Sequence, residues 1–392
     1  MRIRFASLIA TAAIAAVSTQ QPLSAQSYPQ PLTEEPTPAI AWLPERYPDN
    51  WMLVHDFNFN SIPDGRVAII DIAAENRNLK GVVSAAQFGN VLNSTTKSEI
   101  YTAETYYTRL SRGERTDVIT VWDKVSLKPK GEIVLPGGKR GQFVTIKNSF
   151  QFTNAEKWAL VFNFTPGSSV TVVDLEGRKV LGDVDLPGCA MVYPSGERGF
   201  STLCTDGTVT SITLDAAGKI ASASTSKKIN DIDADAMFMM PAMVGKTAWF
   251  LTFKGNLRGV DLAGPVARDL GGFSVGSAGG GTPEWRPSGW QTITADAAGL
   301  LYVLMSPNGK EGSHKDGGSE VWVIDPVKKS RVQRIMLATP GVSIEVSRQA
   351  KPLLVVARAD AVLDVYDAEG GQLVRSLGGA ITFNPLTMTA GR

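Results

Sequence analysis

Residues 170–186, VTVVDLEGRKVLGDVDL, contain a pattern that indicates the fold of the chain. Its first five residues form a short β-branched run that ends at Asp174. Valine and threonine favour a pleated, half-buried strand, and an aspartate side chain can bond the backbone two residues on, which starts a turn. The glycine-containing tip LEGR at 175–178 and a second apolar run follow. The stretch therefore predicts a β-hairpin.

The same pattern occurs seven times along the chain. A further apolar run precedes most copies, such as WALVFNF at 158–164 and LLYVLM at 300–305. The closing aspartates are Asp71, Asp123, Asp174, Asp215, Asp261, Asp325 and Asp367, separated by 52, 51, 41, 46, 64 and 42 residues. Such a period is typical of a four-stranded propeller blade with variable loops. The sequence predicts an all-β fold, a seven-bladed β-propeller over residues 51–392, with an open β-sandwich array as the alternative.

The two ends of this region also carry strand-like runs. WMLV at 51–54 precedes the first copy, and ITFNPLTMT at 381–389 follows the last. We expect strands from the two ends to share one blade and close the ring, because closure removes exposed sheet edges.

Composition excludes several classes of protein. The chain of 392 residues carries 39 Lys+Arg and 38 Asp+Glu, with 43% apolar residues. A formal charge of +1 argues against nucleic acid or an anionic membrane as the main partner, and the apolar content argues against a disordered chain. Because the chain has only two cysteines and two histidines, the sequence predicts no metal site.

The N-terminus has the features of a secretory signal. Arg2 and Arg4 precede an apolar run from Phe5 to Val17, and the small residues Ser24 and Ala25 follow. This predicts a signal peptide at 1–25 and an exported protein. Residues 26–50 hold six prolines and form an N-terminal arm in this interpretation, either a disordered leader or a segment that packs on a partner.

Cys189 and Cys204 flank a PSG turn, 15 residues apart. In an oxidising compartment the two can face each other across a hairpin, which favours a disulfide over two unrelated buried thiols.

The sequence offers no convincing active site. A nucleophile triad needs a histidine, and only His55 and His314 are available, without a G-x-S-x-G motif around any serine. We expect a structural hydrogen bond for His55 and a solvated loop position for His314. The prediction is no catalytic residue in this chain, so that it is a scaffold or a subunit whose chemistry lies elsewhere.

Several stretches resemble one family, the heavy subunit of quinoprotein amine dehydrogenases. RLSRGERTDVITVWD at 109–123 is similar to that family's RGxR-[ST]-D-V block, and EWRPSGWQ at 284–291 to its W-x-P-G-G stretch, with Ser288 where glycine is usual. YVLMSPNGKEGSHK at 302–315 resembles the aromatic amine version, whereas DAEGGQLVRS at 367–376 resembles the methylamine version. The resemblance runs in order from about residue 50 to 385.

The resemblance implies a periplasmic seven-bladed propeller that pairs with a small light subunit, two heavy with two light chains. The light chain carries tryptophan tryptophylquinone, oxidises a primary amine to aldehyde and ammonia, and passes electrons to a blue copper protein such as amicyanin or azurin. The substrate, methylamine or an aromatic amine, stays open. A free-standing propeller hydrolase or lactonase and a non-enzymatic interaction scaffold are the competing hypotheses.

In the family, aromatic residues of the heavy chain line the substrate entrance. The resemblance places Phe88, in AAQFGN, and Phe59, in HDFNFN, at such positions, with Phe57 as an alternative. A place in the propeller core is an equally good interpretation for each of them.

Overall fold

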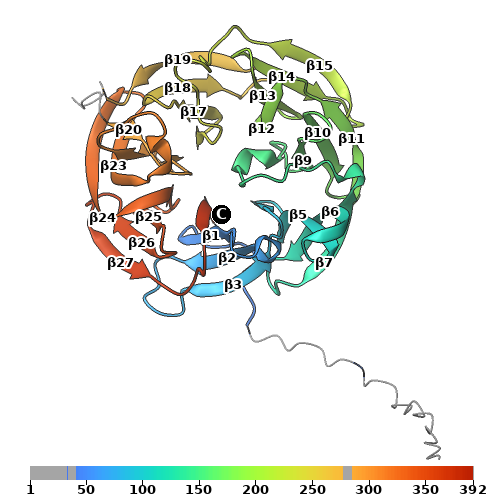
Figure 1. Ribbon diagram of the computed structural model, residues 1–392, viewed down its shortest axis with the longest axis horizontal. Helices are drawn as coiled ribbons and strands as arrows, with labels where there is room; N and C mark the ends of the chain where they lie inside the picture. The colour runs from blue at the N-terminus through green and yellow to red at the C-terminus, as the bar shows by residue number, and fades with distance from the viewer. Residues whose placement is uncertain (1–32, 34–40, 277–284, 392) are drawn as a thin grey trace, which may run out of the picture. The chain divides into compact units, whose positions relative to one another are not determined.

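The computed structural model describes residue 33, residues 41–276 and residues 285–391. Across these ranges the regular elements are β-strands and short 3-10 turns. The sheets of the unit that begins at Ala41 are arranged around a common centre (Figure 1). The predicted all-β propeller is therefore confirmed.

Five sheets have four antiparallel strands each. The first is built from both ends of this unit and the other four follow the chain. Their strands are β28 (Pro385–Ala390), β1 (Trp51–Asp56), β2 (Arg66–Asp71) and β3 (Leu79–Ser84); β4 (Asn90–Asn93), β5 (Glu99–Arg109), β6 (Arg112–Asp123) and β7 (Pro129–Leu135); β8 (Phe150–Phe152), β9 (Trp158–Asn163), β10 (Ser169–Asp174) and β11 (Lys179–Asp185); β12 (Cys189–Ser195), β13 (Gly199–Cys204), β14 (Val209–Leu214) and β15 (Ile220–Thr225); β16 (Ala242–Val244), β17 (Thr247–Leu251), β18 (Asn256–Asp261) and β19 (Arg268–Ser274).

The sixth sheet has eight strands because one of them belongs to two groups. Its strands are β20 (Arg286–Pro287), β21 (Ile293–Ala295), β22 (Leu301–Ser306), β23 (Gly318–Asp325), β24 (Ser330–Val346), β25 (Leu353–Arg358), β26 (Leu363–Asp367) and β27 (Leu373–Leu377). The first part of β24 pairs with β23, from Ser330 opposite Asp325 to Met336 opposite Glu320, and after a register shift Gly341 also pairs with Gly318. Its last part pairs with β25, from Gly341 opposite Arg358 to Val346 opposite Leu354.

The predicted closure of the ring is confirmed. β1 pairs with β28, with Val54 opposite Met388 and Leu53 opposite Thr389. Met52, Val54 and Met388 are fully buried and pack against residues of β25 and β26 such as Val365. The two ends of the ring are thus joined by both backbone pairing and an apolar core.

All seven predicted aspartates end a strand or follow it directly. In each case the carboxylate accepts a hydrogen bond from the backbone N–H two residues on, at 2.8–3.2 Å. These bonds confirm the turn mechanism that the sequence predicts.

Apolar cores fill the space between neighbouring sheets. Ile69 packs with Ile100 of the second sheet, and Ile119 packs with Val161 of the third. One continuous cluster runs from the third sheet to the fifth, through residues such as Phe200 and Phe250. Two more clusters join the fifth sheet to β22 and β23, and these strands to β25 and β26.

The predicted signal peptide and most of the N-terminal arm lie outside the described residues. Residues 41–50 pack on the propeller of the same chain. The Leu43 N–H donates to the Val125 carbonyl at 2.9 Å, and the hydroxyl of buried Tyr47 donates to the Lys124 carbonyl at 2.9 Å. The Tyr47 ring stacks against Trp51 with centroids 5.3 Å apart.

Candidate functional site

The three predicted aromatic residues lie on loops at one end of the ring. Phe57 and Phe59 lie between β1 and β2, and Phe88 lies between β3 and β4. Since neighbouring strands are antiparallel, the end of β1, the start of β2 and the end of β3 share one edge of the sheet. We call this edge, with loops 57–65 and 85–89, the aromatic end. The seven aspartate turns lie at the opposite edge, the aspartate end.

The structure brings Phe59 and Phe88 together and places Phe57 beneath them. The Phe59 and Phe88 ring centroids are 6.3 Å apart, and the Phe57 centroid lies 6.2 Å from that of Phe59. Phe57 is 1% exposed, whereas Phe59 is 43% exposed and Phe88 is half-buried. Phe59 and Phe88 therefore form an accessible aromatic pair, and Phe57 supports it from the core.

The Phe59 loop is fastened to the other end of the chain. The Asp56 carboxylate accepts hydrogen bonds from the N–H groups of Thr382, Phe383 and Asn384 at 2.7–3.2 Å. Asn384 in turn accepts from the Phe59 N–H through its side chain, at 2.9 Å. The closure of the ring thus also fixes the Phe59 backbone.

His55 lies below this aromatic pair in the core. Its ring contacts Phe57 edge-on, with centroids 4.1 Å apart, and it is 1% exposed. Burial lowers the pKa of His55 to about 3, opposed by the backbone of Ala85. Neither ring nitrogen has a hydrogen-bond partner of good geometry among the described residues, so the expected structural hydrogen bond is absent there.

Phe88 lies in a tight turn with an uncommon backbone. Gln87 and Phe88 both adopt left-handed conformations with φ of 54°, which cost about 1 kcal/mol or more each in residues other than glycine. A Cβ at Gly89 would lie 2.6–2.9 Å from backbone atoms of Ala85, so only glycine fits after Phe88. The Gln87 N–H donates to the Ile62 carbonyl at 3.0 Å, which links this turn to the Phe59 loop.

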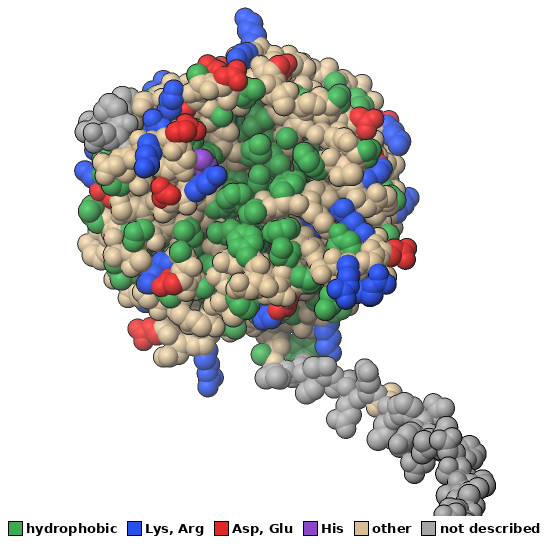
Figure 2. Space-filling model, viewed as in Figure 1, with side chains coloured by type: hydrophobic (Ala, Val, Ile, Leu, Met, Phe, Trp, Pro, Cys, Tyr) green, Lys and Arg blue, Asp and Glu red, His purple; other side chains and the backbone are tan. Residues whose placement is uncertain are grey.

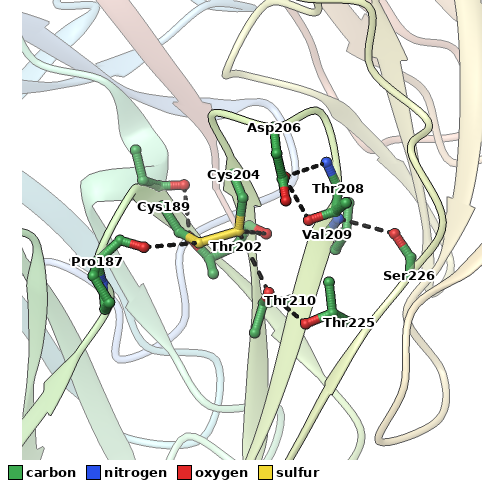
Figure 3. The surroundings of a disulfide bond; sticks show 11 residues. Pro187, Cys189, Thr202, Cys204, Asp206, Thr208, Val209, Thr210, Thr225 and Ser226 are labelled. Carbon is green, nitrogen blue, oxygen red and sulfur yellow. Dashed lines mark hydrogen bonds between the residues drawn. A yellow bond between two sulfur atoms is a disulfide. The ribbon is translucent and has the colours of Figure 1, made fainter.

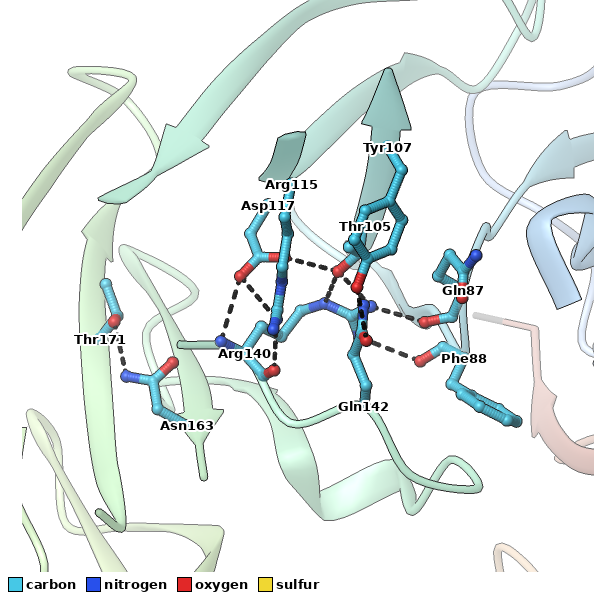
Figure 4. Close-up of polar contacts among 10 residues, drawn as sticks. All are labelled: Gln87, Phe88, Thr105, Tyr107, Arg115, Asp117, Arg140, Gln142, Asn163 and Thr171. Carbon is cyan, nitrogen blue, oxygen red and sulfur yellow. Dashed lines mark hydrogen bonds and ion pairs between the residues drawn. The ribbon is translucent and has the colours of Figure 1, made fainter. Parts of the chain in front are cut away.

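Arg140 supports the same turn from below (Figure 4). Its Nη2 donates to the Gln87 carbonyl at 2.7 Å, and its Nη1 to the Phe88 carbonyl at 3.0 Å. Nε and Nη2 also donate to Thr105 Oγ1, at 3.1 and 2.8 Å. Burial lowers the pKa of Arg140 to about 10, opposed by Asp117, so the group stays charged at neutral pH.

A carboxylate and a second arginine complete the cluster (Figure 4). Asp117 accepts from Thr105 at 2.6 Å and from the Arg140 N–H at 3.2 Å. Arg115 donates to both oxygens of Asp117 at 2.9 Å, and to the Arg140 carbonyl at 2.6 Å. Each guanidinium nitrogen of Arg140 therefore has an acceptor, and the nearby Asp117 offsets the buried charge, as buried ions require.

Apolar side chains are exposed at the aromatic end. The exposed fraction is 79% for Leu110, at the tip of the hairpin β5–β6, 64% for Phe164 and 42% for Met239. Figure 2 shows apolar side chains gathered over the middle of the face in view. Exposed apolar side chains that gather on one face of a protein are typical of an interaction site.

The segment 141–149 contacts residues that lie far along the chain, in the region of the sixth sheet. Trp290 donates its indole N–H to the Thr145 carbonyl at 3.0 Å, and Lys147 forms an ion pair with Glu345 at 2.9 Å. Glu345 is 3% exposed; its pKa is nevertheless lowered because Lys147 and Arg348 outweigh the effect of burial. A cavity of about 350 Å³ lies next to these contacts, and Lys147 and Glu345 line part of it.

The predicted disulfide is confirmed (Figure 3). Cys189 starts β12 and Cys204 ends β13, and the two residues are direct partners across this antiparallel pair. The bond therefore lies at the aromatic end.

The structure does not place His314 at the solvated loop position that the sequence predicts. It is half-buried and packs edge-on against Phe253, with centroids 5.0 Å apart. Within the described ranges, no group of three or more His, Cys, Asp or Glu residues could hold a metal ion, and no helix there is long and apolar enough to cross a membrane.

Comparison with known proteins decides the family. The family model for the methylamine dehydrogenase heavy chain matches residues 60–389, the greater part of the chain and nearly all of the propeller. This chain belongs to the methylamine dehydrogenase heavy chain family.

Curated members of the family are distant but extensive relatives. The methylamine dehydrogenase heavy chain of Methylorubrum extorquens is 28% identical over 302 residues, 76% of this chain and 73% of the relative. That of Methylobacillus flagellatus is 28% identical over 330 residues, 82% of this chain and 81% of the relative. Among solved structures, the dihydro-heme d1 dehydrogenase NirN matches with a TM-score of 0.51 at 14% identity, covering 89% of this chain and 78% of its own. At that identity the likeness shows the fold alone.

Sequence reasoning missed two features of the aromatic end in this member of the family. One is Arg140, which bonds the Phe88 carbonyl from 52 residues away. The other is the exposed Leu110 side chain at the tip of the hairpin β5–β6. The length of the hairpin β5–β6 signals the second, since its strands of 11 and 12 residues exceed most others. Nothing local in the sequence signals the first.

Proposed function

We propose that this chain is the heavy subunit of a periplasmic amine dehydrogenase. The match of the family model across nearly the whole propeller is the observation that carries this proposal. A light subunit bears tryptophan tryptophylquinone, and the assembly contains two heavy and two light chains. The quinone oxidises a primary amine to aldehyde and ammonia, and the electrons pass to a blue copper protein of the amicyanin or azurin type.

This chain contributes a surface and an entrance to that assembly. The exposed apolar side chains of Leu110, Phe164 and Met239 supply an area that a light subunit can cover. Phe59 and Phe88 form the wall of the amine entrance beside it, and the burial of Phe57 favours these two as the residues that an amine touches. No catalytic residue is assigned to this chain.

Seven blades are consistent with the six sheets, because the eight-stranded sheet would contain two blades. β24 would serve as the outer strand of one blade through its first part and as the inner strand of the next through its last part. The apolar clusters support this count, because a separate core lies between β22–β23 and β25–β26. Export by a signal peptide at 1–25 agrees with the disulfide, since disulfides persist outside the cytoplasm.

Purification from the periplasm tests the proposed function. The expected result is co-elution with a small subunit that absorbs as a quinone, and amine-dependent reduction of a dye acceptor. Methylamine and phenylethylamine, compared side by side, assign the substrate class. Ester or lactone hydrolysis by this chain alone, without a small partner, would contradict the proposal.

Phe88→Ala tests the entrance. Removing the half-exposed ring widens the entrance, so the ratio of kcat/KM for phenylethylamine to that for methylamine should change by about ten-fold, while quinone reduction persists. Phe253→Ala is the matched control, an aromatic residue of the same end that contacts His314 instead. An unchanged ratio in Phe88→Ala would show that Phe88 does not line the entrance.

A further inference from the structure

We propose that Arg140 is a positioning residue for amine selectivity, because it fixes the backbone turn that aims the Phe88 ring at the entrance. This inference rests on the proposed function, and it adds a residue that touches neither substrate nor cofactor.

The geometry of the guanidinium group explains why an arginine is needed. Its two terminal nitrogens donate to two consecutive carbonyls, those of Gln87 and Phe88, at 2.7 and 3.0 Å. Two consecutive carbonyls face one donor group here because both residues are left-handed. The planar fork of arginine matches that pair, whereas a lysine ammonium is a point charge that does not match the fork.

The arginine is itself held rigidly. Thr105 accepts from Nε and Nη2, and Asp117 accepts from both the Arg140 N–H and Thr105. Arg140 is 3% exposed, so contacts within the protein, not solvent, decide where its side chain points. The position of the guanidinium is therefore set by β5 and β6, and the Phe88 turn follows it.

The Phe88 ring is partly open to solvent. It points away from the arginine in Figure 4, is half-buried, and its centroid lies 6.3 Å from that of Phe59. The direction of a side chain follows from its backbone, so the left-handed turn decides where this ring lies. Loss of the turn would therefore move the wall of the entrance without removing any residue from it.

Arg115 provides a matched control. It pairs with the same Asp117 and donates to the Arg140 carbonyl, but among the described residues its side chain makes no hydrogen bond or ion pair with the turn 85–89. Arg115→Met should lower stability, because Asp117 loses a partner. The guanidinium of Arg140 keeps its own bonds to Thr105 and to the two turn carbonyls, so the Phe88 turn should stay in place.

The experiment uses the assembled heavy and light chains with Arg140→Lys, Arg140→Met and Arg115→Met. We expect Arg140→Lys to change the phenylethylamine-to-methylamine ratio of kcat/KM about five-fold, mainly through KM, with Arg140→Met at least as large and Arg115→Met unchanged. Hydrogen exchange of the amides of residues 85–89 should accelerate in both Arg140 variants only. In a Phe88→Ala background, Arg140→Lys should no longer change the ratio, because the two residues act as a unit.

The outcomes separate the two proposals. A wild-type complex that oxidises neither amine overturns the proposed function. A wild-type complex that oxidises amines, with Arg140→Lys at the wild-type ratio, overturns the role of Arg140 alone. An equal change in Arg115→Met would also overturn it, because the effect would then be one of general stability. If Arg140→Met does not fold, the charge-conserving lysine variant still decides.

Discussion

The two ends of the propeller are built from contacts of different reach. At the aspartate end, each of seven carboxylates bonds the N–H two residues on, and the same device recurs around the ring. At the aromatic end the contacts join distant parts of the chain. Arg140 holds a carbonyl 53 residues away, and Phe59 bonds a side chain 325 residues away.

This difference would separate the scaffold from the proposed entrance. Repeated local turns build similar sheets whatever the sequence of the loops at the other end, so the aspartate end can be uniform. A binding surface needs a few particular side chains in fixed places, which single long-range contacts provide. The aromatic end should therefore depend on its single contacts more strongly than the aspartate end depends on any one turn.

The largest effect is expected from the disulfide, the covalent contact of the aromatic end. Replacing Cys189 and Cys204 together with serine should lower the free energy of unfolding by about 3 kcal/mol, because the unfolded chain regains the freedom of a loop of this length. Chemical denaturation under oxidising conditions measures the loss.

Reduced wild-type protein is the control for the disulfide, and its unfolding midpoint should coincide with that of the double variant. A difference below about 1 kcal/mol between the oxidised wild type and the variant would mean that strand pairing alone fixes this hairpin.

A somewhat smaller effect is expected from acid, through His55. The folded chain does not protonate this ring until about pH 3, whereas the unfolded chain does so below about 6.5. The unfolded state thus binds the extra proton between these values, so stability falls as pH drops from 6.5 to 3. At pH 5 this difference in proton binding lowers the free energy of unfolding by about 2 kcal/mol.

His55→Leu should remove this part of the pH dependence. Denaturation curves of wild type and variant at pH 8, 7, 6 and 5 measure the difference in their free energies of unfolding. That difference should be constant from pH 8 to 7 and shift in favour of the variant below 6.5. A constant difference down to pH 5 would show that the folded protein accepts the proton.

The same contrast explains which features could be predicted from the sequence. The ends of strands such as β10 and β26 follow from Asp174 and Asp367, because an aspartate turn needs only its own neighbours. The closure of the ring by β28 and the disulfide could also be predicted from the sequence. Closure removes exposed sheet edges, and export places the cysteines in an oxidising compartment, and both constraints are general. The double role of β24 did not, because nothing local marks the point where one strand changes its partner.

The site shows the same limit more sharply. The residues Phe57 and Phe59 are two apart on one loop, yet one is 1% and the other 43% exposed. Their difference depends on Asn384 and Asp56, which hold the loop from the far end of the chain. Likewise, the left-handed turn at Phe88 is stabilised by Arg140, which lies far along the chain between β7 and β8, and no propensity of Gln87 or Phe88 predicts it.

The smallest effect is expected at the aspartate end, from Asp123→Ala. The Asp123 carboxylate accepts from the N–H groups of Val125 and Ser126, at 3.1 and 2.7 Å, and these bonds hold its pKa below the usual range. Their loss should cost about 1 kcal/mol of unfolding free energy, because the freed N–H groups lie near the surface, where water can replace the carboxylate. Asp123→Asn is the matched control and should be nearly neutral, since the amide oxygen can accept the same bonds. Thermal unfolding of both variants measures the difference, and the amine ratio should be unchanged in each. A loss in Asp123→Ala as large as that of the disulfide would contradict the comparison, because a single local turn would then matter as much as a covalent contact at the other end.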